Sequence, residues 1–169
     1  MSYREHGYDS VTERLLLSLD IPSVTAISKF TMPSGHFVCL LACDARNTTV
    51  IEISAFVATL LHAGASYFVC WGPDCERVHD IIDEMLACSG SLYGVPEDSV
   101  IMTTWHASEP LSEALFYFLV CSWPDEHYQD STRTALAISV GSASWAAEIV
   151  EALDRPIEYV RRLCDEDAG

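Results

Sequence analysis

Four short apolar runs, each followed by an amphipathic stretch, dominate the hydrophobic pattern of the chain. Runs of this length suit strands, whereas apolar positions repeating every three or four residues suit helices. Alternation of the two is typical of βα units around a parallel sheet. The predicted strands are residues 37–43, 66–71, 99–105 and 134–140.

This alternation predicts an α/β three-layer sandwich, flavodoxin-like or Rossmann-like, with about four parallel strands and helices on both faces. Right-handed crossovers make 2-1-3-4 the simplest strand order. In that order the first and third strands are neighbours, and the chain changes direction between them. Ligands of such folds bind outside the carboxyl ends of the strands at that point.

The N-terminal segment carries helix signals of its own. Ser10–Glu13 forms a capping-box pattern, and a leucine-rich run follows until a proline ends it. We therefore predict a helical arm over residues 1–22 and a single α/β domain over residues 23–169. Val24–Phe30 is a candidate edge strand, with Pro33–Gly35 as the turn after it.

The three helices that follow the first three strands differ in character. Thr49–Glu52 is a second capping box, and Asp74 is expected to be the N-cap of the next helix. The stretch Leu111–Trp123 is apolar nearly all round, which predicts burial on more than one side. It lies either under its own chain or in an interface, including one with a second copy of the chain.

The formal net charge of −16, with Lys29 as the only lysine, limits the partners. Nucleic acids and anionic membranes both depend on lysine and arginine for attraction, so neither is expected to bind. A basic protein, a cation or a polyamine is attracted instead, over a range that salt shortens. The alternative is that the charge only keeps the protein in solution.

Seven cysteines, an odd number that sits mostly in apolar runs, indicate free buried thiols. The first residues form no apolar leader, and no run is long enough to cross a bilayer, so we expect a cytoplasmic protein. The cysteine spacing lacks a second pair for zinc, so no metal is expected. No dinucleotide, nucleoside triphosphate, hydrolase or zincin motif is present, so no cofactor is expected either.

The predicted strand order brings several polar and aromatic residues to one edge of the sheet. We expect four of them, Asp44, Arg46, Trp105 and His106, to line one pocket. The full set of predicted ligand-binding residues is Asp44, Arg46, Trp71, Asp74, Thr104, Trp105, His106 and Ser142. The alternative interpretation is that these residues only cap helices, pack against their neighbours or face solvent at the strand ends, as in any α/β fold.

Two other pairs are weaker candidates for chemistry. Cys75 and His79 lie one helical turn apart, where a thiol could be the nucleophile and the imidazole its base. Crowding by neighbouring acids opposes formation of the thiolate. The spacing His106-x-x-Glu109 is interpreted as a chance pair of the kind that acidic chains contain.

The stretch Ser142-Ala-Ser-Trp145-Ala-Ala-Glu148 is similar to the serine, tryptophan and glutamate stretch of TIR-type nucleotide hydrolases. The resemblance implies a catalytic role for Glu148 at a nicotinamide–ribose bond. The match is short, follows the fourth strand, and has Ala146 where that family usually has cysteine. A capping serine followed by an amphipathic helix explains the same residues.

A wider resemblance rests on three stretches, Trp71–Asp80, Thr104–His106 and Ser122–Glu126. They resemble an uncharacterised bacterial family of small acidic α/β proteins. The resemblance covers most of the chain from the first strand onward and implies no activity.

The acidic net charge and the lack of catalytic and cofactor motifs favour an acidic protein-binding module that acts on a basic partner protein. Such a module would be of the immunity, antitoxin or defence-accessory type. The alternative is a small nucleotide- or nucleoside-directed enzyme, or a ligand-binding domain, that uses the strand ends. Its candidate catalytic residues are Asp44, His106, Cys75, His79 and Glu148.

Overall fold

The computed structural model describes residues 3–27, 32 and 35–166, and within them six strands form one mixed sheet. The strand order is β1-β2-β6-β3-β4-β5, and every neighbouring pair is parallel except β1 and β2. The strands are β1 (Arg4–Tyr8), β2 (Leu15–Ile21), β3 (His36–Cys43), β4 (Ala65–Trp71), β5 (Met102–His106) and β6 (Thr132–Val140).

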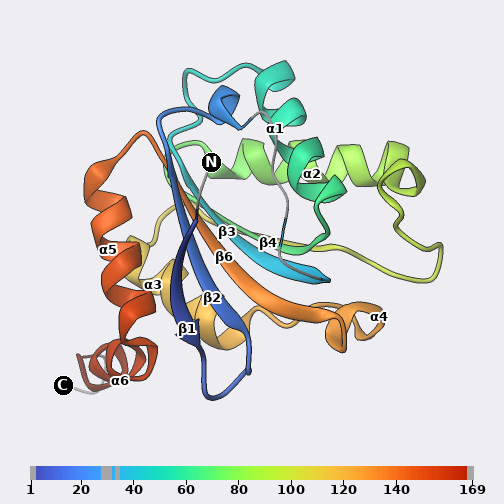
Figure 1. Ribbon diagram of the computed structural model, residues 1–169. Helices are drawn as coiled ribbons and strands as arrows, with labels where there is room; N and C mark the ends of the chain where they lie inside the picture. The colour runs from blue at the N-terminus through green and yellow to red at the C-terminus, as the bar shows by residue number, and fades with distance from the viewer. Residues whose placement is uncertain (1–2, 28–31, 33–34, 167–169) are drawn as a thin grey trace.

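Helices cover both faces of the sheet (Figure 1). The helices are α1 (Val50–His62), α2 (Cys75–Ser89), α3 (Leu111–Phe116), α4 (Glu126–Gln129), α5 (Ala143–Asp154) and α6 (Pro156–Glu166). Helices α1 and α2 pack on one core with strand residues such as Phe37 and Phe68. Helices α3, α5 and α6 pack on the other core with Val38 and Val69. Adjacent strand residues point to opposite faces, so the two cores share the same strands.

The predicted three-layer α/β class and the parallel pairing of the four predicted strands are confirmed. The strand count is higher than predicted, and the strand order is wrong. Strand β6 lies between β2 and β3, so the four predicted strands follow the order 4-1-2-3. The predicted neighbours β3 and β5 are separated by β4, so the chain does not change direction between β3 and β5. The spacing of strands and helices along the chain limits the handedness of the crossover connections. It does not determine which distant strand pairs with β3.

The predicted N-terminal helix is wrong, because its leucine run forms β2, paired in parallel with β6. The capping-box residues instead form the turn of a β1–β2 hairpin. There the Asp9 carboxylate accepts hydrogen bonds from the Thr12 amide and hydroxyl, at 2.8 and 2.6 Å. Glu13 has a positive φ of 57° in the same turn. A strand that is buried on both faces has a continuous run of apolar residues. The spacing of apolar positions does not distinguish such a run from a short buried helix.

Other boundaries differ in detail. In the predicted edge strand Val24–Phe30, residues Val24–Ala26 form a 3₁₀ turn, η1, and residues 28–30 lie outside the described residues. Residues 33–34 of the predicted turn Pro33–Gly35 also lie outside the described residues. The Thr49 capping box is confirmed. Asp74 precedes α2 but does not cap it, because its φ is +65° and its carboxylate accepts from Arg77 at 2.6 Å.

The predicted apolar helix consists of α3 and a π-helical turn, η3 (Tyr117–Cys121). Leu115 and Phe118 pack into the core of this chain, as one of the two alternatives predicted. Val120 and Trp123 remain 40% and 51% exposed. An interface with a second copy through this segment stays a prediction.

Candidate functional site

The carboxyl end of β5 carries a buried histidine beside a cavity. His106 is 7% exposed, and its Nδ1 lies 2.5 Å from Oε2 of Glu109. A carboxylate only accepts hydrogen bonds, so Nδ1 carries a proton, and Nε2 of a neutral His106 is an acceptor. This Nε2 atom is buried and has no hydrogen-bond partner among the described residues. The pair therefore resembles the oriented imidazole of an acid–base site.

Aromatic side chains hold this pair in place. Trp71, at the end of β4, donates a 2.8 Å hydrogen bond from Nε1 to the Glu109 carbonyl. The Tyr117 ring lies 4.8 Å from the His106 ring, and its hydroxyl is 2.8 Å from that of Tyr67. Burial raises the pKa of Tyr67, so this hydroxyl stays neutral over the physiological range. The pair is thus fixed by β4, β5 and the α3–η3 segment together.

The cavity beside His106 has a volume of about 590 Å³ and lies between the start of α3 and the end of α6. Its lining includes two carboxylates, Glu109 and Glu113, and the rings of His106, Phe116 and Tyr117. No lysine or arginine is among the described residues that line it. Carboxylates and aromatic faces both attract cations, so the cavity is suited to an ammonium or guanidinium group.

The predicted partners Asp44 and Arg46 lie elsewhere, at the end of β3. They pair with each other, with Arg46 Nη2 at 2.6 Å from Asp44 Oδ2. This hydrogen bond lowers the pKa of Asp44 and raises that of Arg46. Neither residue lines the cavity beside His106. Binding of a ligand by Asp44 and Arg46 stays a prediction.

Trp105 and His106 are adjacent in sequence but face opposite sides of the sheet. The Trp105 ring lies 4.5 Å from the ring of His79 on α2, whereas the His106 ring contacts Tyr117 beyond α3. Thr104 shares the His106 face because side chains alternate along a strand. The pocket predicted to hold Trp105 and His106 together therefore does not form around both.

The pair of Cys75 and His79 lacks the features of a nucleophile and its base. Cys75 is 1% exposed, and burial raises the pKa of its thiol. His79 instead lies 3.2 Å from an Asp80 oxygen and 3.5 Å from an Asp83 oxygen. A buried thiol with a raised pKa contains little thiolate at neutral pH, which disfavours nucleophilic attack.

The residues of the short TIR-like stretch have structural partners. Ser142 Oγ accepts a hydrogen bond from the Trp145 amide at 3.4 Å, so this serine caps α5 as the alternative interpretation expected. Trp145 packs edge-on against Trp71 at 5.1 Å. Glu148 accepts a 3.4 Å hydrogen bond from the Tyr159 hydroxyl, and burial raises the pKa of the carboxyl. A catalytic role for Glu148 stays a prediction.

Sequence reasoning found His106 but missed the residues around it. The prediction that His106-x-x-Glu109 is a chance pair is wrong, because the two side chains form a short hydrogen bond. Glu113 and Tyr117 follow Glu109 at intervals of four residues; Glu113 and Tyr117 lie on one side of the α3–η3 segment, and Glu109 lies in the bend just before it. This four-residue spacing is the signal in the sequence that these side chains lie close together. Only the position of α3 after β5 shows that they face His106.

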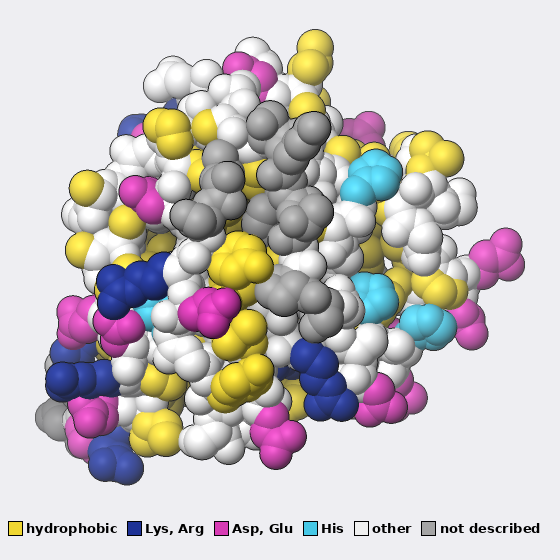
Figure 2. All heavy atoms as spheres, in the orientation of Figure 1, with side chains coloured by type: hydrophobic (Ala, Val, Ile, Leu, Met, Phe, Trp, Pro, Cys, Tyr) yellow, Lys and Arg dark blue, Asp and Glu magenta, His cyan; other side chains and the backbone are white. Residues whose placement is uncertain are grey.

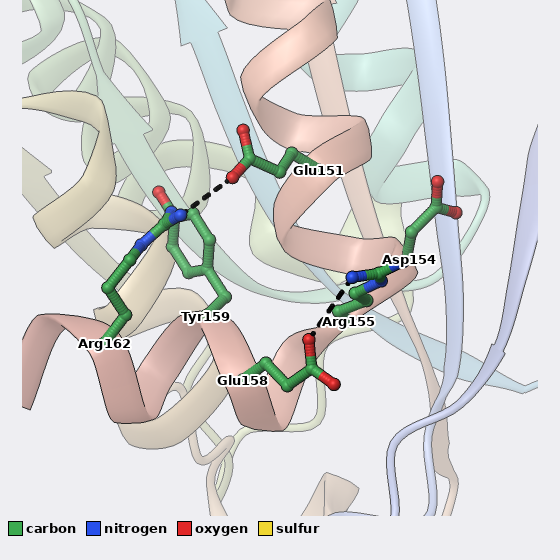
Figure 3. Close-up of a pocket in the computed structure, with 6 residues that line it drawn as sticks. All are labelled: Glu151, Asp154, Arg155, Glu158, Tyr159 and Arg162. Carbon is green, nitrogen blue, oxygen red and sulfur yellow. Dashed lines mark hydrogen bonds and ion pairs between the residues drawn. The ribbon is translucent and has the colours of Figure 1, made fainter.

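A second cavity, of about 350 Å³, lies where α5 and α6 meet. Figure 3 shows that its charged side chains pair with each other, Arg162 with Glu151 at 3.0 Å and Arg155 with Glu158 at 3.5 Å. Figure 2 likewise shows basic and acidic side chains side by side at the lower left, over α6. A cavity whose charges are already paired attracts a charged ligand weakly.

Within the described residues, no group of three or more His, Cys, Asp or Glu side chains is placed to hold a metal ion. None of the helices in the same part of the chain combines the length and apolar character that a membrane span requires.

Comparison with protein families gives a match that covers most of the chain. The family described as "Domain of unknown function (DUF7684)" matches residues 16–156 and indicates no activity. No curated protein matches the chain. The match starts within β2 and extends through α5, so it includes the five parallel strands and the cavity-forming α3. The chain therefore belongs to the DUF7684 family of domains of unknown function.

Proposed function

We propose that this protein is an acidic protein-binding module that recognises a basic partner, and that the cavity beside His106 receives a lysine or arginine side chain. The observation that carries the proposal is the cavity lining, with two carboxylates, three rings and no lysine or arginine among its described residues. The net charge of −16 gives the same preference over long range. Immunity, antitoxin or defence-accessory proteins are the functional class that this proposal favours.

The geometry also supports a mode of recognition for one cationic side chain. A guanidinium or ammonium group in the cavity would pair with Glu109 and Glu113, while its aliphatic stem packs against Phe116. Paired charges that leave water contribute more to affinity than charges at an exposed rim. The cavity would therefore anchor the partner, and the remaining surface acids would speed the encounter.

The experiment is capture of the partner from the source organism, followed by association kinetics at a series of salt concentrations. We expect a basic partner whose association slows as salt rises. The double variant Glu109→Gln/Glu113→Gln should weaken binding by about tenfold or more, which corresponds to about 1.4 kcal/mol. The control Glu5→Gln/Glu13→Gln removes the same charge at the opposite edge of the sheet and should have a smaller effect. A partner that is not basic, or equal effects of the two double variants, would contradict the proposal.

The His106–Glu109 hydrogen bond favours a second candidate function, a small enzyme in which Nε2 of His106 would be the general base once the cavity opens onto this buried atom. Two glutamates in the cavity disfavour phosphate groups, so a nucleoside is a better substrate for this candidate than a nucleotide. Calorimetric titration with unphosphorylated nucleosides tests it. Binding that His106→Ala abolishes and His79→Ala preserves would favour the enzyme.

A further inference from the structure

Strand β5 is the last strand of the sheet, and its outer side has no neighbouring strand among the described residues. Its backbone pairs with β4 on the inner side, and no other backbone–backbone hydrogen bond among the described residues involves residues 102–106. At the end of the strand, the backbone of His106 also forms a hydrogen bond with the Cys75 thiol. An edge strand in this state presents a row of unpaired N–H and C=O groups, which can template the addition of another strand.

Apolar side chains are exposed along this edge. Met102 is 39% exposed and Trp105 is 47% exposed, and Val100, just before the strand, is 56% exposed. By contrast, β4 is buried along its length except at Trp71. Exposed tryptophan at the centre of a surface is typical of residues that anchor a protein partner.

Carboxylates flank the edge on both faces of the sheet. On the α2 face, Asp83 accepts a 2.6 Å hydrogen bond from the Thr103 hydroxyl, and Asp80 lies 3.2 Å from His79, whose ring contacts Trp105. On the α3 face, Glu109 lies against His106 at the end of the strand.

The one arginine of α2 does not offset these charges. Arg77 forms an ion pair with Asp74 at 2.6 Å and also donates to the carbonyls of Ala45 and Thr48, in the loop after β3. Its charge is therefore held on the β3 side of the helix, away from the β5 edge.

We propose that the β5 edge takes an extended basic segment of the partner as an added strand. This inference rests on the proposed function and names its mode of binding. Successive side chains of an added strand point to opposite faces. Basic side chains on one face would meet Asp80 and Asp83, and those on the other would approach Glu109 and the cavity beside His106. Backbone pairing would provide affinity, and the flanking carboxylates would select a basic segment.

The test compares two blocked eight-residue peptides of equal charge, one repeating two arginines and two valines and the other repeating two arginines and two prolines, so that both carry arginines on both faces. An added strand pairs through every second residue, and adjacent prolines remove N–H groups whichever set of residues faces β5, so only the first peptide is able to pair along its length. We expect the arginine–valine peptide to bind at least about tenfold more tightly at low salt. Its binding should also slow amide hydrogen exchange across residues 102–106, whereas the arginine–proline peptide should leave that exchange unchanged.

Two exposed tryptophans provide a matched pair of variants. Trp105→Ala should weaken the arginine–valine peptide severalfold, and Trp123→Ala, with a side chain equally exposed but beyond α3, should leave it unchanged. Equal, salt-dependent binding of both peptides would overturn strand addition and leave recognition by charge standing. Failure of both peptides to bind at low salt would overturn strand addition and recognition by charge alike. A dimer of this chain that Trp105→Ala dissociates would replace the basic segment with a second copy as the occupant.

Discussion

Gly72 connects β4 to α2 at a position that a side chain does not fit. Its φ is +111°, and a Cβ atom there would lie 2.5 Å from the carbonyl oxygen of Cys43. The close approach of the two backbones brings the end of β4, with Trp71, beside the end of β3. A single residue without a side chain therefore helps to position one support of the His106 cavity.

We expect Gly72→Ala to lower the free energy of unfolding by about 1–3 kcal/mol, because the new methyl group meets backbone that has no room to move. Urea denaturation measures this change. Gly94→Ala is the control, since Gly94 also has a positive φ, +75°, but a Cβ atom there meets nothing within 4 Å. Equal losses in the two variants would show that the contact with Cys43 is unimportant.

At the scale of elements, β1 is fastened to α5 by one carboxylate. Asp154 lies 2.8 Å from Arg4 Nη2 and 2.7 Å from His6 Nδ1. The hydrogen bond from His6, followed by the charge of Arg4, lowers the pKa of Asp154 below its ordinary value of 3.8. A carboxyl with a lowered pKa stabilises the folded state above its unfolded pKa, and this contribution is lost as pH falls through the folded pKa.

The variant Asp154→Asn should therefore lower the free energy of unfolding at pH 7 by less than about 1 kcal/mol, because the carboxylate and Arg4 are exposed to solvent. The difference from the parent protein should shrink below pH 3.8, the ordinary pKa of Asp154. Urea unfolding between pH 7 and pH 3 measures both quantities. Asp165→Asn, which changes an exposed acid at the end of α6, is the control. A loss that is constant across this pH range would exclude the electrostatic explanation.

For the whole molecule, the seven cysteines divide into two groups by burial. Cys39, Cys43, Cys70 and Cys75 are buried, whereas Cys88, Cys121 and Cys164 are exposed. Burial raises the pKa of Cys43 to about 11, and also raises the pKa values of the other three buried thiols. The sequence-based expectation of buried free thiols in apolar runs is confirmed for Cys39, Cys43 and Cys70, but it is wrong for Cys88 and Cys121, which are exposed.

We expect three thiols to react with a maleimide in the folded protein at neutral pH and all seven to react after unfolding, because thiolate and access are both needed. Mass spectrometry of the labelled protein counts them. Removal of Cys88, Cys121 and Cys164 by substitution with serine should abolish labelling of the folded form. Rapid labelling of Cys75 in that variant would instead favour the nucleophile interpretation of this residue.

Local patterns in the sequence determined the class of the fold. Four apolar runs alternating with helices indicated the parallel strands β3, β4, β5 and β6, because strand and helix periods are encoded within a few residues. The Thr49 capping box and the Ser142 cap were visible for the same reason. His106 was a candidate because ligands of parallel sheets bind at strand ends.

Tertiary structure alone decided the strand order and therefore which strand ends meet. The leucines of β2 became a strand because pairing with β6 satisfies their backbone and the two helical layers bury both faces, neither of which local spacing records. Insertion of β6 beside β3 left β5 at the edge, separated Asp44 from His106, and turned Glu109 and Glu113 towards the cavity. Such choices depend on pairing between residues far apart in the chain, whose energies are set only when the whole sheet forms.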